Sequence, residues 1–145
     1  APEFDLCVII PAHNEEGAVA LTVERVRAVL SALPIRHEIV LVDDGSKDGT
    51  LAAAERTGAR VIASPVNRGY GWALKRGIGA SRSEYVAILD ADGTYPHEVL
   101  PEFLELARSA EMVVGDRSAA MNNVPWIRRP AKWVLSKLAN FLARA

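Results

Sequence analysis

The sequence has little of several features that decide a protein's class at once. Among its 145 residues there is one cysteine, Cys7, and aromatic residues make up only 6%. A single cysteine excludes a disulfide framework and a cysteine-rich zinc site. No apolar run approaches the length of about 18 residues that a transmembrane helix needs. Half of the residues are apolar and the net charge is −1, which excludes a disordered chain and predicts one packed domain.

Acidic residues are absent from the end of the chain. Residues 117–145 hold six basic residues and no acidic one, whereas residues 1–116 carry a net charge of −7. An acidic body with a basic end indicates an anionic partner at that end. A solvated helix is the simpler alternative, and charge alone favours it.

The basic end also has apolar residues at helical spacing, and these would form one face of a helix: Ala131, Val134, Leu135, Leu138, Phe141, Leu142 and Ala145. Lys132 and Lys137 fall on the other face, and Trp133 lies near the boundary. Such a helix is typical of a membrane interface, although a helix packed on a sheet has the same pattern. We therefore divide the chain into an α/β core, residues 1–116, and a basic amphipathic segment of the same domain, residues 117–145.

Short β-branched runs alternate with longer helical patterns along the core. The expected strands are residues 6–10, 38–42, 60–63, 85–89 and 112–114, and the expected helices are residues 16–33, 48–57, 71–80 and 96–109. Nearly continuous apolar strands predict a parallel sheet with helices on both faces, a doubly wound α/β fold. We expect Ser46 to cap the second helix, Asp48 to lie in its first turn and Pro96 to begin the fourth. In such folds ligands bind beyond the carboxyl ends of the strands.

The first expected strand lacks the glycine-rich turn of a dinucleotide site. Residues 11–17 (PAHNEEG) contain one glycine and two carboxylates, which would repel a pyrophosphate and exclude a dehydrogenase. An acidic helix start explains Glu16. Pro11, His13 and Glu15 are candidates for contact with a base or a ribose.

The second expected strand ends in two adjacent carboxylates, Asp43 and Asp44, before Gly45 and Ser46. An aspartate at this place is common at nucleotide sites, where it accepts hydrogen bonds from ribose or base. A turn with a helix cap would explain Asp44 and Ser46. Two carboxylates exceed what a turn needs, so Asp43 is the stronger candidate for the nucleotide.

The fourth expected strand ends in Asp90 and Asp92, with Ala91 between them and Gly93 after them. The two carboxylates converge if the chain turns there, and paired hard oxygens suit Mg²⁺ or Mn²⁺. An ordinary acidic loop is the alternative. The run DADGT also resembles haloacid dehalogenase-like phosphatases, but those carry it on their first strand and need an acidic pair downstream, whereas no acidic residue follows Asp116.

Five motifs in order resemble a second enzyme family over residues 6–144. They are residues 8–15 (VIIPAHNE), 42–50 (VDDGSKDGT), 67–69 (NRG), 90–92 (DAD) and 113–117 (VVGDR). Together they are similar to the nucleotide-binding half of family 2 glycosyltransferases, in the variant of the dolichyl-phosphate mannose synthases and bacterial polyprenyl-phosphate glycosyltransferases. The resemblance implies the glycosyltransferase A fold, a Rossmann-like three-layer arrangement with a mostly parallel sheet, which we expect to be cut short at its C-terminal end.

The resemblance also implies roles for single residues. Nucleotide contacts are implied for Pro11, His13, Glu15, Asp43, Asp44 and Ala91. Asp90 and Asp92 are the implied catalytic carboxylates and ligands of Mg²⁺ or Mn²⁺ on the donor diphosphate. Arg117 is also implied to be catalytic and would face the acceptor phosphate. Arg128 or Arg129 would assist it in contacting that phosphate. Thr94 stands where many of these synthases have glutamine.

The implied activity is metal-dependent, inverting transfer of a sugar from GDP-mannose or a UDP-hexose to a polyprenyl or dolichyl phosphate. A cation would stabilise the leaving diphosphate, and arginine would position the anionic acceptor. This implies a cytoplasmic protein, either free or peripheral at the cytoplasmic membrane face, with no nucleic-acid partner. A nucleotide-sugar-binding fragment without turnover is the main alternative, and a phosphatase is a remote one.

Overall fold

The computed structural model describes residues 1–115. The chain divides into two compact units, Ala1–Glu111 and Met112–Ala145, and the fold below is that of the first. The expected acceptor contacts Arg117, Arg128 and Arg129, and the amphipathic segment 117–145, lie outside the described residues.

Four parallel strands form the central sheet in the order β3-β2-β1-β4. They are β1 (Phe4–Ala12), β2 (His37–Asp44), β3 (Arg60–Ser64) and β4 (Ser83–Ile88). The register places Ala12 beside Asp43 and Asp44 beside Ser64, and it pairs Ile9 with Ile88. All four carboxyl ends therefore meet at one edge of the sheet, as a parallel arrangement requires.

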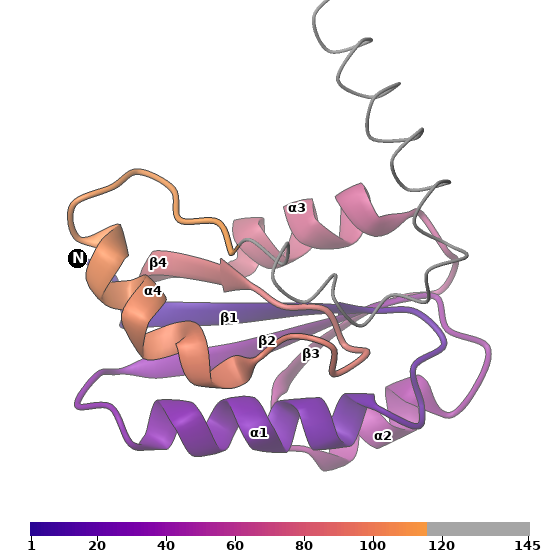
Figure 1. Ribbon diagram of the computed structural model, residues 1–145. Coiled ribbons are helices and arrows are strands. Elements are labelled where there is room, and N and C mark those ends of the chain that lie inside the picture. The colour runs from indigo at the N-terminus through magenta and orange to yellow at the C-terminus, as the bar shows by residue number, and fades with distance from the viewer. Residues whose placement is uncertain (116–145) are drawn as a thin grey trace, which may run out of the picture. The chain divides into compact units, whose positions relative to one another are not determined.

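Helices cover both faces of the sheet (Figure 1). On one side lie α1 (Val19–Ser31), α2 (Thr50–Arg56), a 3₁₀ turn η1 (His97–Val99) and α4 (Leu100–Ala107), and on the other lies α3 (Tyr70–Ala80). Strand residues alternate between two buried clusters: Val8 and Ile10 belong to the α1 side, whereas Cys7 and Ile9 belong to the α3 side. The predicted three-layer α/β fold is confirmed.

Two expected helix starts are wrong. Helix α2 begins after Gly49 without a side-chain cap, because the Ser46 hydroxyl accepts the backbone N–H of Asn14 instead (2.9 Å). Asp48 precedes the helix and accepts the N–H of Thr50 (3.0 Å). Pro96 precedes η1 rather than opening α4.

The expected strand at residues 112–114 is also wrong. No strand is assigned there, and Met112 and Val114 are 79% and 74% exposed. A strand needs a neighbouring strand to receive its hydrogen bonds, and the four strands described here pair only with one another.

We expected helices to cover both faces of every strand, but one face of β4 is partly exposed. Val86 and Ile88 are each 41% exposed, because α3 packs against β1 and β2 and β4 is an edge strand. Within residues 1–115, no helix is both long and apolar enough to span a bilayer.

Gly77 sets the distance between α3 and the sheet. A Cβ atom at this position would lie 2.5 Å from Ile9 Cγ2 and 3.3 Å from Val42 Cγ2, and both of these side chains are fully buried. Only a residue without a side chain lets the helix approach so closely.

We predict that Gly77→Ala lowers the free energy of unfolding. Overpacking costs about 1–3 kcal/mol and exceeds the gain in helix propensity of up to about 1 kcal/mol. Gly79→Ala is the matched control, because nothing lies within 4 Å of its Cβ position, and it should be neutral or stabilising. Urea denaturation of the two variants compares them directly, and equal stability would contradict this account of the helix contact.

Candidate active site

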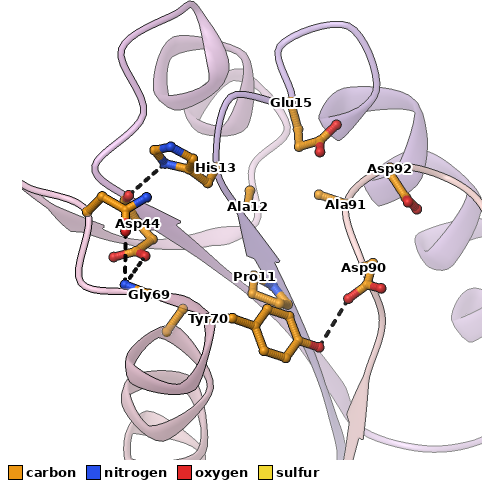
Figure 2. A pocket seen from close by; sticks show the side chains of 12 residues that line it. Pro11, Ala12, His13, Glu15, Asp44, Gly69, Tyr70, Asp90, Ala91 and Asp92 are labelled. Carbon is orange, nitrogen blue, oxygen red and sulfur yellow. Dashed lines mark hydrogen bonds between the residues drawn. The ribbon is translucent and has the colours of Figure 1, made fainter. Parts of the chain in front are cut away.

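A pocket of about 410 Å³ opens at the carboxyl edge of the sheet. Figure 2 shows His13, Asp44 and Gly69 on one side of it and Asp90, Ala91 and Asp92 on the other, with Pro11 and Ala12 between them. The lining residues are Pro11, Ala12, His13, Glu15, Asp44, Asn67, Gly69, Tyr70, Ala73, Asp90, Ala91 and Asp92. The pocket therefore collects residues from the ends of β1 and β2, from the loops after β1, β3 and β4, and from the start of α3.

The turns after β1 and β2 are bonded to each other. Asn14, in a left-handed conformation (φ 56°), accepts the N–H of Lys47 through its side chain (2.9 Å). The N–H of Glu15 donates to Thr50 Oγ1 (2.7 Å), and Glu16 Oε2 accepts the N–H of Gly49 (2.6 Å). These bonds use the polar groups of both turns for structure and hold His13 and Glu15 at the pocket.

His13 is held in one tautomer. Its Nδ1 lies 2.9 Å from the backbone oxygen of Asp44, which can only accept, so Nδ1 carries the hydrogen. Nε2 is then the acceptor for the side-chain amide of Asn14 (3.2 Å). A ring held by hydrogen bonds at the pocket offers a flat surface to a ligand.

Asp44 holds the loop after β3 against the pocket. Its two oxygens accept the N–H groups of Arg68 (2.8 Å) and Gly69 (2.7 Å). Gly45 allows this loop to approach, because a Cβ atom there would lie 2.3 Å from the backbone carbon of Val66. The side chain of Asp44 is therefore both a pocket wall and a loop clamp.

The structure places Asp44 at the wall of the pocket and buries Asp43 beside it. Successive strand side chains point to opposite faces, and it is Asp44 that lines the pocket while Asp43 does not. Asp43 is 1% exposed, and its Oδ2 accepts the N–H of Ser46 (3.4 Å). Its Oδ1 has no hydrogen-bond partner among the described residues.

Each carboxylate after β4 has one oxygen engaged. Asp92 Oδ1 accepts both the N–H (2.9 Å) and the hydroxyl (2.8 Å) of Thr94, and Asp90 Oδ1 accepts the hydroxyl of Tyr70 (3.1 Å; Figure 2). The second oxygen of each receives no hydrogen bond from the described residues. Between them, the backbone oxygen of Ala91 accepts the Thr22 hydroxyl (3.0 Å), which anchors this loop to α1.

The charges in the pocket are of one sign. Glu15, Asp44, Asp90 and Asp92 line it, and no lysine or arginine is among the lining residues that the structure describes. Partial burial and the nearby negative charge of Asp90 raise the pKa of the Tyr70 hydroxyl to about 12. Such a pocket favours a cation, and a cation bound there would offset the negative charge of a phosphate.

The second carboxylate oxygens of Asp90 and Asp92, which accept no hydrogen bond from residues 1–115, suit a hard divalent cation. Described residues form no group of three or more histidine, cysteine, aspartate or glutamate side chains that could hold a metal. A pair of carboxylates is nevertheless a usual protein contribution for Mg²⁺, which keeps waters and takes phosphate oxygens from a substrate.

The structure brings together most of the residues that the sequence singled out. Those it places at the pocket are Pro11, His13, Glu15, Asp44, Asp90, Ala91 and Asp92. Sequence reasoning gave no role to the contribution from the loop after β3 and from α3, namely Asn67, Gly69, Tyr70 and Ala73. The available signals were the motif at residues 67–69 and the end of the third expected strand, because all carboxyl ends of a parallel sheet lie at one edge.

Comparison with known proteins identifies the family. Residues 7–144 match the family described as Glycosyl transferase family 2. The chain is 40% identical over 133 residues to undecaprenyl-phosphate 4-deoxy-4-formamido-L-arabinose transferase of Pseudomonas aeruginosa. The aligned region covers 88% of this chain and 39% of that protein. It is 42% identical over 114 residues to the low-salt glycan biosynthesis hexosyltransferase Agl6 of Haloferax volcanii, covering 77% of this chain and 27% of that protein. The chain thus spans well under half the length of these relatives.

Solved structures agree with the family and the fold. Glucosyl-3-phosphoglycerate synthase of Mycobacterium tuberculosis in complex with UDP matches at a TM-score of 0.62 and 27% identity, over 75% of this chain and 42% of that one. The same enzyme with Mn²⁺, UDP and glucosyl-3-phosphoglycerate matches at a TM-score of 0.57 and 28% identity, over 70% and 38%. The family match extends along nearly the whole chain, and the parallel sheet with an acidic pocket at its carboxyl edge is consistent with it. The chain therefore belongs to glycosyl transferase family 2.

Proposed function

We propose that this chain is the donor-binding part of an enzyme that moves a sugar from a nucleotide sugar to a polyprenyl phosphate. The observation that carries the proposal is the charge of the pocket: four carboxylates and no described basic side chain line it. A nucleoside diphosphate can bind there only if a divalent cation neutralises it. Asp90 and Asp92 each have an oxygen available for that cation, so the residues fit a metal-dependent transferase.

The nucleoside belongs on the side of the pocket opposite the carboxylate pair. His13 offers a flat surface there beside Asp44, and Pro11 and Ala12 lie between the two sides (Figure 2). Asn67 and Glu15 add polar groups to the lining. Asp44 keeps acceptor capacity, because a carboxylate oxygen has more than one lone pair. A uridine or a guanosine donor matches this chemistry, and the UDP bound to the mycobacterial synthase supports a UDP-sugar.

The metal supplies charge stabilisation to the leaving diphosphate, and Mg²⁺ and Mn²⁺ both suit the ligands. Asp90 and Asp92 would hold it, and the donor would then lie at the carboxyl edge of the sheet. The structure of the related synthase with Mn²⁺ supports this cofactor.

A polyprenyl phosphate is the proposed acceptor because the curated relative named above is an undecaprenyl-phosphate transferase. Its phosphate is already an anionic nucleophile, so one in-line displacement suffices, and that displacement inverts the anomeric carbon. Arg117, Arg128 and Arg129 remain the proposed contacts of this phosphate, and the basic segment 117–145 the proposed contact with the cytoplasmic face of a membrane.

The alternative is a module that binds a nucleotide sugar without turnover. It is favoured by the position of the pocket, because every described lining residue lies within residues 11–92 and the proposed acceptor contacts lie outside that range. Family membership argues against the phosphatase, whose only support was the run DADGT.

We predict metal-dependent donor binding. Calorimetric titration of the chain with GDP-mannose and UDP-glucose should detect binding of at least one donor in Mn²⁺. Removing the metal, or substituting Asp92→Ala, should weaken that binding at least tenfold, because uncompensated carboxylates then face the diphosphate. Glu102→Ala, at an exposed position of α4, is the matched control and should bind like the unsubstituted chain.

Two results would refute the transferase proposal: no donor binding in Mn²⁺, or metal-dependent binding that survives Asp92→Ala. Adding undecaprenyl phosphate to the bound donor then separates the two remaining possibilities. Release of the nucleoside diphosphate identifies an enzyme, whereas binding without release identifies the non-catalytic module.

We also predict binding to anionic membranes. In a flotation assay, the full chain should float with vesicles containing phosphatidylglycerol and stay below with neutral phosphatidylcholine vesicles. Charge reversal at Lys132 and Lys137 should reduce flotation, because each basic group near an anionic surface contributes about 1 kcal/mol. Charge reversal at Lys47 and Arg56, two exposed residues outside the basic segment, is the control with the same change in net charge. Equal flotation of both variants, or no flotation at all, would exclude the membrane role of the segment.

A further inference from the structure

Tyr70 makes a contact across the pocket to which the donor binding proposed above assigns no role. It is the first residue of α3, and its hydroxyl lies 3.1 Å from Asp90 Oδ1 (Figure 2). A carboxylate oxygen can only accept, so the hydroxyl of Tyr70 donates. The side chain is 55% exposed, so core packing alone does not account for its orientation.

The backbone before Tyr70 is held in place. Gly69 precedes the helix in a left-handed conformation (φ 93°), and its N–H is bonded to Asp44 Oδ2 and to Asn67 Oδ1 (3.0 Å). Helix α3 therefore starts at a fixed point of the pocket wall. A chain of contacts runs from Asp44 through Gly69 and Tyr70 to Asp90.

Asp90 and Asp92 are supported in the same way by different groups. Thr94 donates twice to one oxygen of Asp92, and Tyr70 donates once to one oxygen of Asp90. In both cases the donor occupies Oδ1 and leaves Oδ2 without a hydrogen bond from the described residues. The support for Asp92 is local, whereas that for Asp90 comes from another element, 20 residues away in sequence.

We propose that Tyr70 is a positioning residue for the divalent cation, holding Asp90 by one oxygen so that the other oxygen is available to the metal. The inference rests on the proposed function, because it assigns the metal to the same carboxylate pair. A carboxylate that is already oriented loses less side-chain freedom on binding a cation. Tyr70 itself does not touch the metal in this account.

The competing interpretation is that Tyr70 obstructs the metal by occupying an oxygen that the metal needs. The two interpretations differ in sign. Removing the hydroxyl weakens metal binding if Tyr70 positions Asp90, and strengthens it if Tyr70 competes with the cation.

The test compares Tyr70→Phe with the unsubstituted full chain. Free Mn²⁺ is measured by electron paramagnetic resonance during titration in saturating UDP, or in GDP if only that nucleotide binds. We expect the dissociation constant for Mn²⁺ to rise about tenfold, within the range of about 10- to 100-fold seen when outer ligands are removed. Any residual nucleotide affinity without metal should be the same in both proteins, and excess Mn²⁺ should restore the metal-dependent affinity.

Tyr85→Phe is the matched control, because Tyr85 packs against the cluster on the α1 side of the sheet, and it should leave Mn²⁺ binding unchanged. In an Asp90→Asn background, Tyr70→Phe should have no further effect, because the hydroxyl acts through Asp90. This double variant also guards against a general disturbance of the fold, which would add to the loss.

The outcomes separate this inference from the proposed function. If the chain binds Mn²⁺ with nucleotide in an Asp92-dependent manner and Tyr70→Phe binds it equally well or more tightly, the positioning role is wrong and the proposed function stands. If the unsubstituted chain binds no Mn²⁺ with either nucleotide, both are wrong.

Discussion

The pocket depends on the hydrogen bonds that the carboxylate of Asp44 accepts from the N–H groups of Arg68 and Gly69. Hydrogen bonds to an ionised group are about twice as strong as neutral ones, and Asp44 is only 3% exposed. They join the end of β2 to the start of α3, two elements far apart in the chain. The wall of the pocket, the place of Tyr70 and its contact with Asp90 all follow from this junction.

The charge of the pocket is the main physical argument for the proposed ligand. Carboxylates from three strand ends line one pocket at the edge of a parallel sheet, and no described basic side chain lines it with them. A protein that only needed a stable turn at each strand end would not direct all of them at one cavity. Together with membership of glycosyl transferase family 2, this arrangement explains why a metal and a diphosphate are expected as a pair.

Much of the fold followed from pattern alone, because strands such as residues 6–10 and 38–42 are apolar throughout and bounded by turn residues. The edge that carries the site followed from the parallel topology. Contacts between distant turns could not be predicted. The hydroxyl of Ser46, for example, accepts the N–H of Asn14 and does not cap the helix that follows it. The choice between Asp43 and Asp44 depends on which face each strand residue takes, and two adjacent carboxylates do not reveal it. Residues 112–114 have strand-like composition but no partner strand among those described.

The most direct measurement is a crystal structure of the chain with UDP and Mn²⁺, or with GDP if only that nucleotide binds, read from the anomalous signal of manganese. The account predicts one manganese peak contacting Asp90 and Asp92, with the diphosphate beside it and the nucleoside against His13 and Asp44. A bound nucleotide whose manganese lies away from both aspartates, or a nucleotide bound outside this pocket, would contradict it.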